Sequence, residues 1–332
     1  TYDEWDFRAN GYRHQWCLLR EQVLDRGEPG YFDETLAKHS RTAREVQRQF
    51  QMLKPELFRK IKNLPEGEDF DLDALVEAQV DRRRGLASSE KLYWRRNKEE
   101  RSVAVAFLLD VSASTDEDVV KDREPEDPWK DWDDDPRNYM VFLRERMQHR
   151  EQLKKTRRRI IDVEKESTVL LIHALETLGD SYGVYGFSGY GRDNVEVFVV
   201  KGLEEPFGET VKGRLEKLEP VRGTRMGAAI RHATSKLDAY DARLKVLLLL
   251  SDGRPQDHDY GRDRTEKEYA LQDTRKALLE ARQKQIVPFA LTVDREGHDY
   301  LKTICEGIGY EVVDDIESLP ARLPALYRQL TS

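Results

Sequence analysis

Short apolar runs alternate with longer amphipathic stretches from residue 102 to the end of the chain. Val103–Leu109 is uniformly apolar and runs into Asp110, and Lys245–Ser251 carries a second apolar run that leads into Asp252. Runs this short, bounded by polar turn residues, are typical of strands buried on both faces of a parallel sheet. Further strands are predicted at Tyr182–Phe187, Val195–Val200, Val287–Val293 and Tyr310–Val313.

Helical patterns fill the stretches between these strands. They are predicted at Ile160–Leu178, Met226–Leu237, Thr265–Lys284 and Leu319–Leu330. Strand–helix alternation implies right-handed crossovers between parallel strands. We therefore expect residues 98–332 to form an α/β domain with a doubly wound, mostly parallel, Rossmann-like sheet.

A different pattern precedes this domain, and we expect residues 1–97 to form a helical N-terminal extension. In Glu34–Lys62 apolar residues recur at three- and four-residue steps, the stripe of an amphipathic helix. Pro55 is expected to bend or break that helix. A second helix is expected to begin near Asp71 or Asp73, either of which can cap it.

A charged insertion interrupts the alternation at about residues 116–159. Asp116–Asp135 is crowded with carboxylates and contains Trp129 and Trp132, and the basic stretch Arg144–Arg159 follows. Charge blocks of this kind are usually solvated loops, which is the interpretation we adopt. The two tryptophans leave docking of a partner open as an alternative.

The composition of the chain indicates which kinds of partner it binds and in which compartment it is found. The net charge is −8 and both signs are interleaved, which argues against nucleic acid as the main partner. No apolar run approaches the ~20 residues that a membrane span requires. Cys17 and Cys305 are the only cysteines. So few thiols, without metal-ligand spacing, indicate a cytoplasmic protein in which both are buried and inert.

Oxygen donors collect where the predicted strands end. Asp110 and Asp252 follow apolar strands, so both are expected at the carboxyl edge of the sheet, where ligands bind in open α/β folds. Ser112 and Ser114 alternate in the loop after Asp110, and Thr224 opens a predicted helix. Carboxylate and hydroxyl oxygens are the ligands that Mg²⁺ prefers. We therefore predict a site for Mg²⁺, or another divalent cation such as Mn²⁺.

A site with few charged ligands leaves its metal ion able to accept a carboxylate from outside. The predicted mechanism is metal-bridged adhesion to an Asp or Glu of a target protein. Each residue also has a simpler interpretation: the two aspartates could merely end strands, and Thr224 could be only a helix N-cap.

The predicted site residues lie in three segments: Phe107-Leu-Leu-Asp-Val-Ser-Ala-Ser114, Gly223-Thr224-Arg-Met-Gly-Ala-Ala-Ile230 and Leu250-Ser-Asp-Gly-Arg-Pro255. Together these segments resemble the metal-ion-dependent adhesion site of von Willebrand factor A domains. The resemblance implies that Ser112, Ser114 and Thr224 touch the metal. It implies that Asp110 and Asp252 act on the metal directly or through water.

Further segments are Lys91-Leu-Tyr-Trp-Arg-Arg96, Ile161-Asp-Val-Glu-Lys165 and Tyr185-Gly-Phe-Ser-Gly-Tyr-Gly191. Together with the expected helical N-terminal extension, they give the whole chain a closer resemblance to the NorD/CbbO group. The resemblance implies an adaptor that couples a target to a hexameric MoxR-type AAA+ ATPase of the CbbQ or NorQ kind. The long acidic insertion favours a CbbO-like protein acting on Rubisco. The alternative is a NorD-like protein acting on nitric oxide reductase.

No nucleotide-binding P-loop occurs in the sequence, so ATP hydrolysis is expected in a partner chain and this chain is predicted to be non-catalytic. The segment Gly186–Tyr190 lacks the second glycine of a nucleophile elbow. A metal-dependent hydrolase and a scaffold without an ATPase partner stay open as alternatives. Asp257, His258 and Asp259 are minor candidates for the metal edge.

Overall fold

The structure is a computed structural model in which two compact units are described separately. One comprises Thr1–Phe50 with Val103–Ser332, and the other comprises Gln51–Ser102. The described residues are 1–53, 58–87, 89–98, 102–117, 158–251, 255–260, 267–292, 302, 304–305, 307–312 and 330. The predicted insertion therefore lies outside the described residues between 118 and 157, as do Pro55, Asp252 and all but the end of the helix expected at 319–330.

The larger unit is built on a seven-stranded sheet. In chain order its strands are β3 (Leu19–Val23), β7 (Val103–Asp110), β8 (Ser181–Gly189), β9 (Val195–Lys201), β10 (Leu244–Leu250), β11 (Ile286–Thr292) and β12 (Gly309–Val312). Their spatial order is β12-β11-β10-β7-β8-β9-β3, and every neighbouring pair is parallel except β8 and β9. The predicted α/β fold with a mostly parallel sheet is confirmed.

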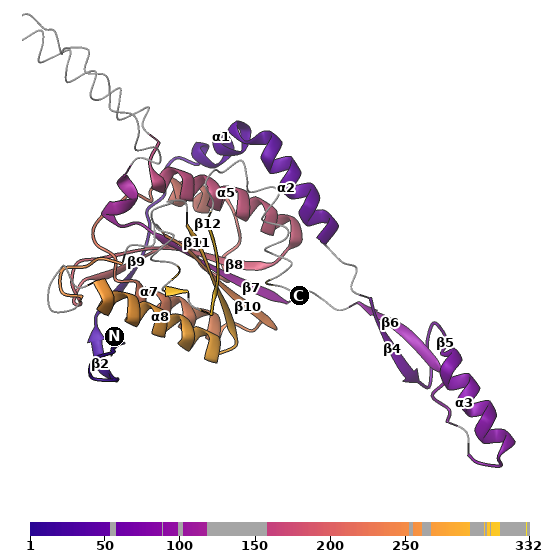
Figure 1. Cartoon of the computed structure of the whole chain (residues 1–332). Helices are drawn as coiled ribbons and strands as arrows, with labels where there is room; N and C mark the ends of the chain where they lie inside the picture. Colours follow the sequence, from indigo (N-terminus) through magenta and orange to yellow (C-terminus); the bar gives the residue numbers. More distant parts are fainter. Residues whose placement is uncertain are drawn as a thin grey trace, which may run out of the picture. The chain divides into compact units, whose positions relative to one another are not determined.

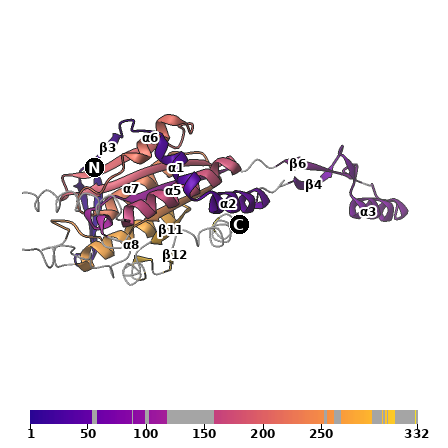
Figure 2. The same cartoon turned by 90° about the horizontal axis from the view of Figure 1, so that it is seen from above.

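Helices cover both faces of this sheet, as Figures 1 and 2 show. The first face carries α1 (Gly30–Lys38), α2 (Ser40–Leu53) and α5 (Ile160–Leu178), with α6 (Glu209–Glu216) beside α1. The opposite face carries α7 (Met226–Ala239) and α8 (Lys267–Gln283). The helices predicted from residues 160, 226 and 265 are confirmed. None of the described helices is both long and apolar enough to cross a membrane.

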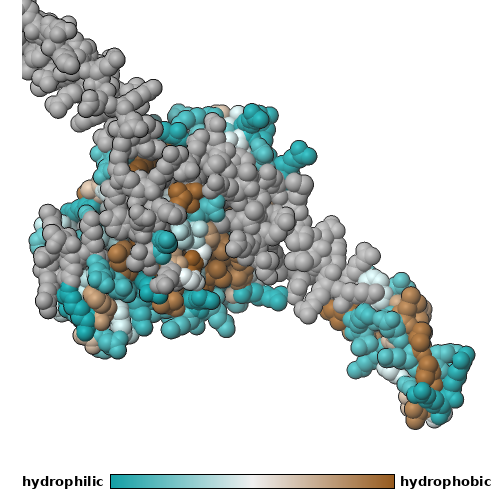
Figure 3. All heavy atoms as spheres, viewed as in Figure 1, coloured by the Kyte–Doolittle hydropathy of each residue, from teal (hydrophilic) through white to brown (hydrophobic). Residues whose placement is uncertain are grey.

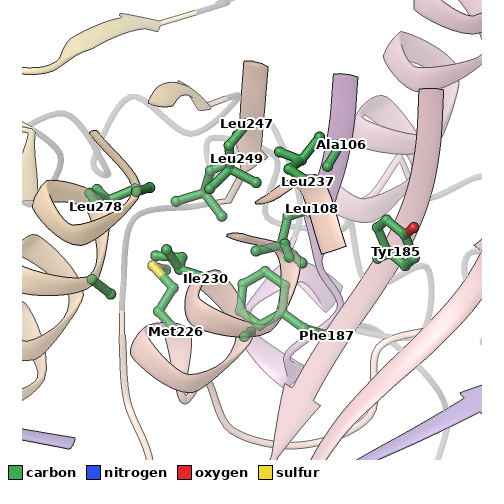
Figure 4. Close-up of a cluster of buried hydrophobic side chains, with 14 of the residues drawn as sticks. Ala106, Leu108, Tyr185, Phe187, Met226, Ile230, Leu237, Leu247, Leu249 and Leu278 are labelled. Carbon is green, nitrogen blue, oxygen red and sulfur yellow. The ribbon is translucent and has the colours of Figure 1, made fainter. Parts of the chain in front are cut away.

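A hydrophobic core fills the layer between the sheet and helices α7 and α8 (Figure 4). Leu108, Phe187 and Leu249 point into it from three adjacent strands, and Ile230 and Leu278 point into it from the helices. Each of these side chains is at most 1% exposed. Full burial stabilises the fold by roughly 1.5–3 kcal/mol for each side chain of this kind. All eight residues of β7 are buried, which explains its unbroken apolar run before Asp110.

The N-terminal residues differ from the expected helical extension over 1–97. Strands β1 (Tyr2–Asp6) and β2 (Gly11–Cys17) form an antiparallel hairpin, and β3 joins the main sheet beside β9. Four of the five residues of β3 are exposed, so its sequence carries no apolar alternation that would identify a strand. Its place at the sheet edge comes from backbone pairing with a strand far along the chain.

The smaller unit combines a three-stranded antiparallel sheet with one helix. Its elements are β4 (Phe58–Leu64), β5 (Asp69–Phe70), β6 (Tyr93–Lys98) and α3 (Leu72–Arg83), with strand order β4-β6-β5. The predicted cap is confirmed, because the Asp71 side chain accepts a hydrogen bond from the Asp73 amide. Past the helix end, Gly85 adopts a φ of 75°, a conformation that glycine tolerates best.

Candidate metal site

Strand β7 delivers Asp110 to the carboxyl edge of the sheet in a fully buried position. Its Oδ1 accepts a hydrogen bond from the Ser112 amide at 2.9 Å, and its Oδ2 accepts one from the Ser251 hydroxyl at 2.7 Å. Ser251 directly follows strand β10, which pairs with β7 in the sheet. Two neighbouring strands therefore orient one buried carboxylate, which is more than the end of a strand requires.

The loop after Asp110 brings two hydroxyl groups together. It turns through the short 3₁₀ helix η1 (Ala113–Asp116), and the Oγ atoms of Ser112 and Ser114 lie 2.8 Å apart. Ser112 is buried, whereas Ser114 is half-exposed. Neighbouring ligands of an octahedral Mg²⁺ lie about 3 Å apart, given metal–oxygen distances of about 2.1 Å. The spacing of these hydroxyls fits two adjacent positions around such an ion.

A segment from more than 100 residues later packs against this loop. Val221 donates its backbone N–H to the Val111 carbonyl at 2.8 Å, and the Ala113 amide donates to the Arg222 carbonyl at 2.5 Å. Ser112 and Arg222 form a parallel bridge. This pairing places the chain leading to Thr224 beside the two serines.

Thr224 itself is 1% exposed, and its amide donates to the Gln256 carbonyl at 2.6 Å. Helix α7 begins at Met226, so Arg225 occupies the cap position and no side chain caps the helix. The alternative interpretation of Thr224 as an N-cap is therefore wrong. The position of Thr224 is set by hydrogen bonds between its own segment, the loop after β7 and the segment around Gln256.

Gly223 allows this close approach. A Cβ atom there would lie 2.8 Å from the Gln256 carbonyl oxygen and 3.2 Å from that of Gly189. Both obstacles are backbone atoms, which cannot move without shifting the loop. The glycine before Thr224 is thus required by packing at the sheet edge.

A buried arginine that the sequence did not single out anchors the same segment. Arg225 is 0% exposed and donates to Glu4 at 2.8 Å, Asp257 at 2.8 Å and Asp259 at 2.5 Å. Asp257 also accepts the Gly191 amide at 2.8 Å. A buried charge is stable only when it is paired, and three carboxylates meet that need here. In the sequence, the acidic residues Asp257 and Asp259 were the one sign of this cluster.

The three residues named above as minor metal-ligand candidates have other contacts in the structure. Asp257 and Asp259 bind Arg225, and His258 is exposed with its ring 5.3 Å from that of Tyr190. Within the described residues, no group of three or more His, Cys, Asp or Glu side chains is arranged for a metal. Among the described residues, the oxygen donors left at this edge are hydroxyl groups together with Asp110.

Of the five predicted ligands, four lie in this region of the structure. They are Asp110, Ser112, Ser114 and Thr224. Asp252 lies outside the described residues, next to Ser251, whose hydroxyl binds Asp110.

The named curated proteins that the chain resembles are NorD proteins. The chain is 35% identical over 331 residues to the protein NorD of Brucella melitensis, covering 99% of this chain and 45% of that protein. It is 30% identical over 312 residues to NorD of Stutzerimonas stutzeri, covering 94% of this chain and 44% of that protein. The chain is similar to NorD proteins throughout. It spans less than half the length of these relatives.

No family model matches the chain. Among solved structures, it aligns with the vWF domain of the type V pili tip protein Mfa5 from Porphyromonas gingivalis. That alignment has a TM-score of 0.42 and 8% identity, and it covers 70% of this chain and 97% of the other.

Proposed function

We propose that this chain is a NorD-like adaptor whose von Willebrand factor A-type domain binds a target protein through a divalent metal. The observation that carries the proposal is the arrangement at the end of β7. A buried Asp110 is oriented by two donors, beside a pair of serine hydroxyls 2.8 Å apart. Hydroxyl and carboxylate donors without His or Cys favour Mg²⁺ or Mn²⁺ over softer metals.

In this proposal the metal is held by Asp110, Ser112, Ser114, Thr224 and Asp252. When bound, the ion supplies a positive centre that accepts one carboxylate of the target. The chain's own residues orient that centre and shield it, because Asp110, Ser112 and Thr224 are almost fully buried. Ser114 is half-exposed and marks the side from which a target approaches. The chain itself performs no catalysis.

The NorD relatives support nitric oxide reductase as the target better than they support Rubisco. Both curated relatives described above carry the name NorD, at 30–35% identity over nearly the whole chain. The NorD alternative is therefore preferred over the CbbO-like interpretation that the acidic insertion favoured. A MoxR-type AAA+ ATPase of the NorQ kind is the proposed source of force.

Metal binding is the first test, measured by titration calorimetry of the full chain with Mg²⁺ and Mn²⁺. Ser114→Ala removes one proposed ligand at a half-exposed position and should weaken binding at least about tenfold, since lost ligand support typically costs 10–100-fold. Ser235→Ala, an exposed serine on α7, is the matched control and should bind like the wild type. Equal affinity for all three proteins would overturn the metal site.

Target capture is the second test. Purified nitric oxide reductase, Rubisco and a NorQ-type hexamer are each presented to the immobilised chain, with Mg²⁺ or with EDTA. We expect capture of nitric oxide reductase that EDTA and Ser114→Ala both abolish. Capture of Rubisco instead would restore the CbbO-like interpretation, and capture that ignores EDTA would separate the metal from target binding.

A further inference from the structure

Helix α3 of the smaller unit carries a row of apolar side chains that the described structure leaves uncovered. Leu72 is 75% exposed, Val76 is 64% exposed and Val80 is 40% exposed. Residues four apart lie on one face of a helix, so the three form a continuous stripe. No residue of α3 is fully buried, so this face is not part of the unit's own core.

Two further exposed apolar side chains flank the helix in the chain. Phe70, just before α3, is 44% exposed, and Leu86, just after it, is 59% exposed. Figure 3 shows hydrophobic side chains gathered along the part of the chain that Figure 1 labels α3. Contiguous exposed apolar surface of this kind marks an interaction site.

Charges along the helix indicate which partner fits. The N-terminal end is acidic, with Asp69, Asp71 and Asp73, and the C-terminal end carries Arg82–Arg84, which outnumber Asp81 beside them. A surface with opposite charges at its two ends is complementary to itself when a second copy lies antiparallel. Antiparallel pairing also sets the positive end of one helix dipole beside the negative end of the other.

We propose that α3 binds α3 of a second copy of this chain, antiparallel, around a two-fold axis at Val76. Leu72 and Val80 lie equally far from Val76 along the chain, so each faces the other across the axis. Asp69, in β5 just before the helix, and Arg83, in its last turn, lie on opposite sides of Val76, so antiparallel pairing brings their opposite charges to the same end of the contact. Such a contact is isologous and closes as a dimer.

Asp69 and Arg83 are available for this pairing. Both side chains are exposed, and neither forms an ion pair with another described residue. By contrast, Asp73 is already paired with Lys62 at 3.0 Å within the unit. The Asp69–Arg83 pair therefore tests the dimer more cleanly than a pair that involves Asp73 would.

The contact is small. A helix of 12 residues is about 18 Å long, and standard interfaces bury about 1,600 Å². We therefore expect a dimer that dissociates on dilution. The proposal is independent of the metal site, because a chain that binds no metal can still dimerise through α3.

Crosslinking of the full chain tests the two-fold axis. Val76→Cys places one thiol of each copy at the axis, and mild oxidation should give a disulfide-linked dimer. Glu77→Cys, exposed on the same helix but beside the stripe, is the matched control. Both native cysteines are buried. Equal crosslinking of the two variants, or none, would overturn the proposed axis.

Charge exchange tests the antiparallel register by sedimentation equilibrium. Asp69→Arg alone and Arg83→Asp alone should each weaken the dimer by roughly threefold or more, since each dimer contains two such pairs. The double variant should restore wild-type association, because the pairs reform with signs exchanged. Val76→Glu should be monomeric at every concentration, with unchanged circular dichroism.

Two results of the sedimentation experiments would also overturn the proposal. Additive weakening in the double variant would rule out the Asp69–Arg83 pair. A wild-type chain that stays monomeric at the highest concentration would mean that a different protein covers the stripe.

Discussion

The guanidinium of Arg225 and the carboxylate of Glu4 lie 2.8 Å apart, although 221 residues separate them in the chain. Arg225 is 0% exposed and Glu4 is 1% exposed. Because Arg225 directly follows Thr224, this ion pair connects strand β1 to the segment that carries a proposed metal ligand. The N-terminal hairpin is thus part of the structure that positions the sheet edge.

Replacing Arg225 should lower the free energy of unfolding of the larger unit. Arg225→Met keeps an unbranched apolar side chain but removes the guanidinium, so Glu4 and Asp257 stay buried without that cation. Loss of one partner of a buried pair costs about 3–5 kcal/mol, which urea unfolding measures directly. Arg222→Met, three residues earlier and 49% exposed, is the control and should cost little. Equal stability of both variants would show that the Arg225 cluster is not stabilising.

Low pH should reduce the stability that the Arg225 cluster gives to the larger unit. Burial tends to raise the pKa of the Asp259 carboxyl, but the hydrogen bond and charge of Arg225 outweigh it and hold that pKa below its usual 3.8. A lowered folded pKa means that the stabilisation is complete above the unfolded pKa of about 4 and is lost as pH falls through the folded value.

The free energy of unfolding, measured from pH 6 down to pH 3, checks this effect. Asp259→Asn should make the acid loss shallower than in the wild type. Asp193→Asn, at a side chain that is 73% exposed, should follow the wild-type curve. Identical slopes for Asp259→Asn and the wild type would contradict the prediction.

Gly227, inside the Gly-Thr-Arg-Met-Gly segment, should tolerate no side chain. A Cβ there would overlap the Asp273 carboxylate, which the Trp5 amide and Arg231 each hold at 2.8 Å. We expect Gly227→Ala to destabilise the larger unit by about 1–3 kcal/mol in thermal or urea unfolding. In Gly202→Ala the nearest new contact is 3.8 Å, so it should stay close to wild type. A neutral Gly227→Ala would show that Asp273 can move aside.

Both thiols should be unreactive in the folded protein. Burial raises the pKa of the Cys305 thiol to about 12, and burial together with the nearby Glu4 carboxylate raises that of Cys17. The thiolate is the reactive form, so an aromatic disulfide reagent at pH 8 should react at the rate of unfolding. The same reagent in denaturant should titrate two thiols at once. Fast reaction of one native thiol would contradict the prediction and support solvent access at that cysteine.

Local patterns predicted the elements around the candidate site. The helix from Ile160 to Leu178 has the predicted bounds, and β7 ends at Asp110 where its apolar run stops. Both are properties of consecutive residues, since burial on a helix face or within a sheet imposes a period that the sequence displays directly. The alternation of Ser112 and Ser114 in the loop after Asp110 is likewise a property of consecutive residues.

What the sequence by itself determined is the α/β alternation and the oxygen donors at strand ends, because short-range periodicity encodes both. Only the tertiary structure placed β3 at the sheet edge and buried Arg225 between Glu4, Asp257 and Asp259. An arginine is ordinarily exposed, and the residues near Arg225 in the sequence do not identify its partners. Pairing across 221 residues depends on how whole elements pack, and the cost of burying a charge selects the partners only once the fold has brought them together.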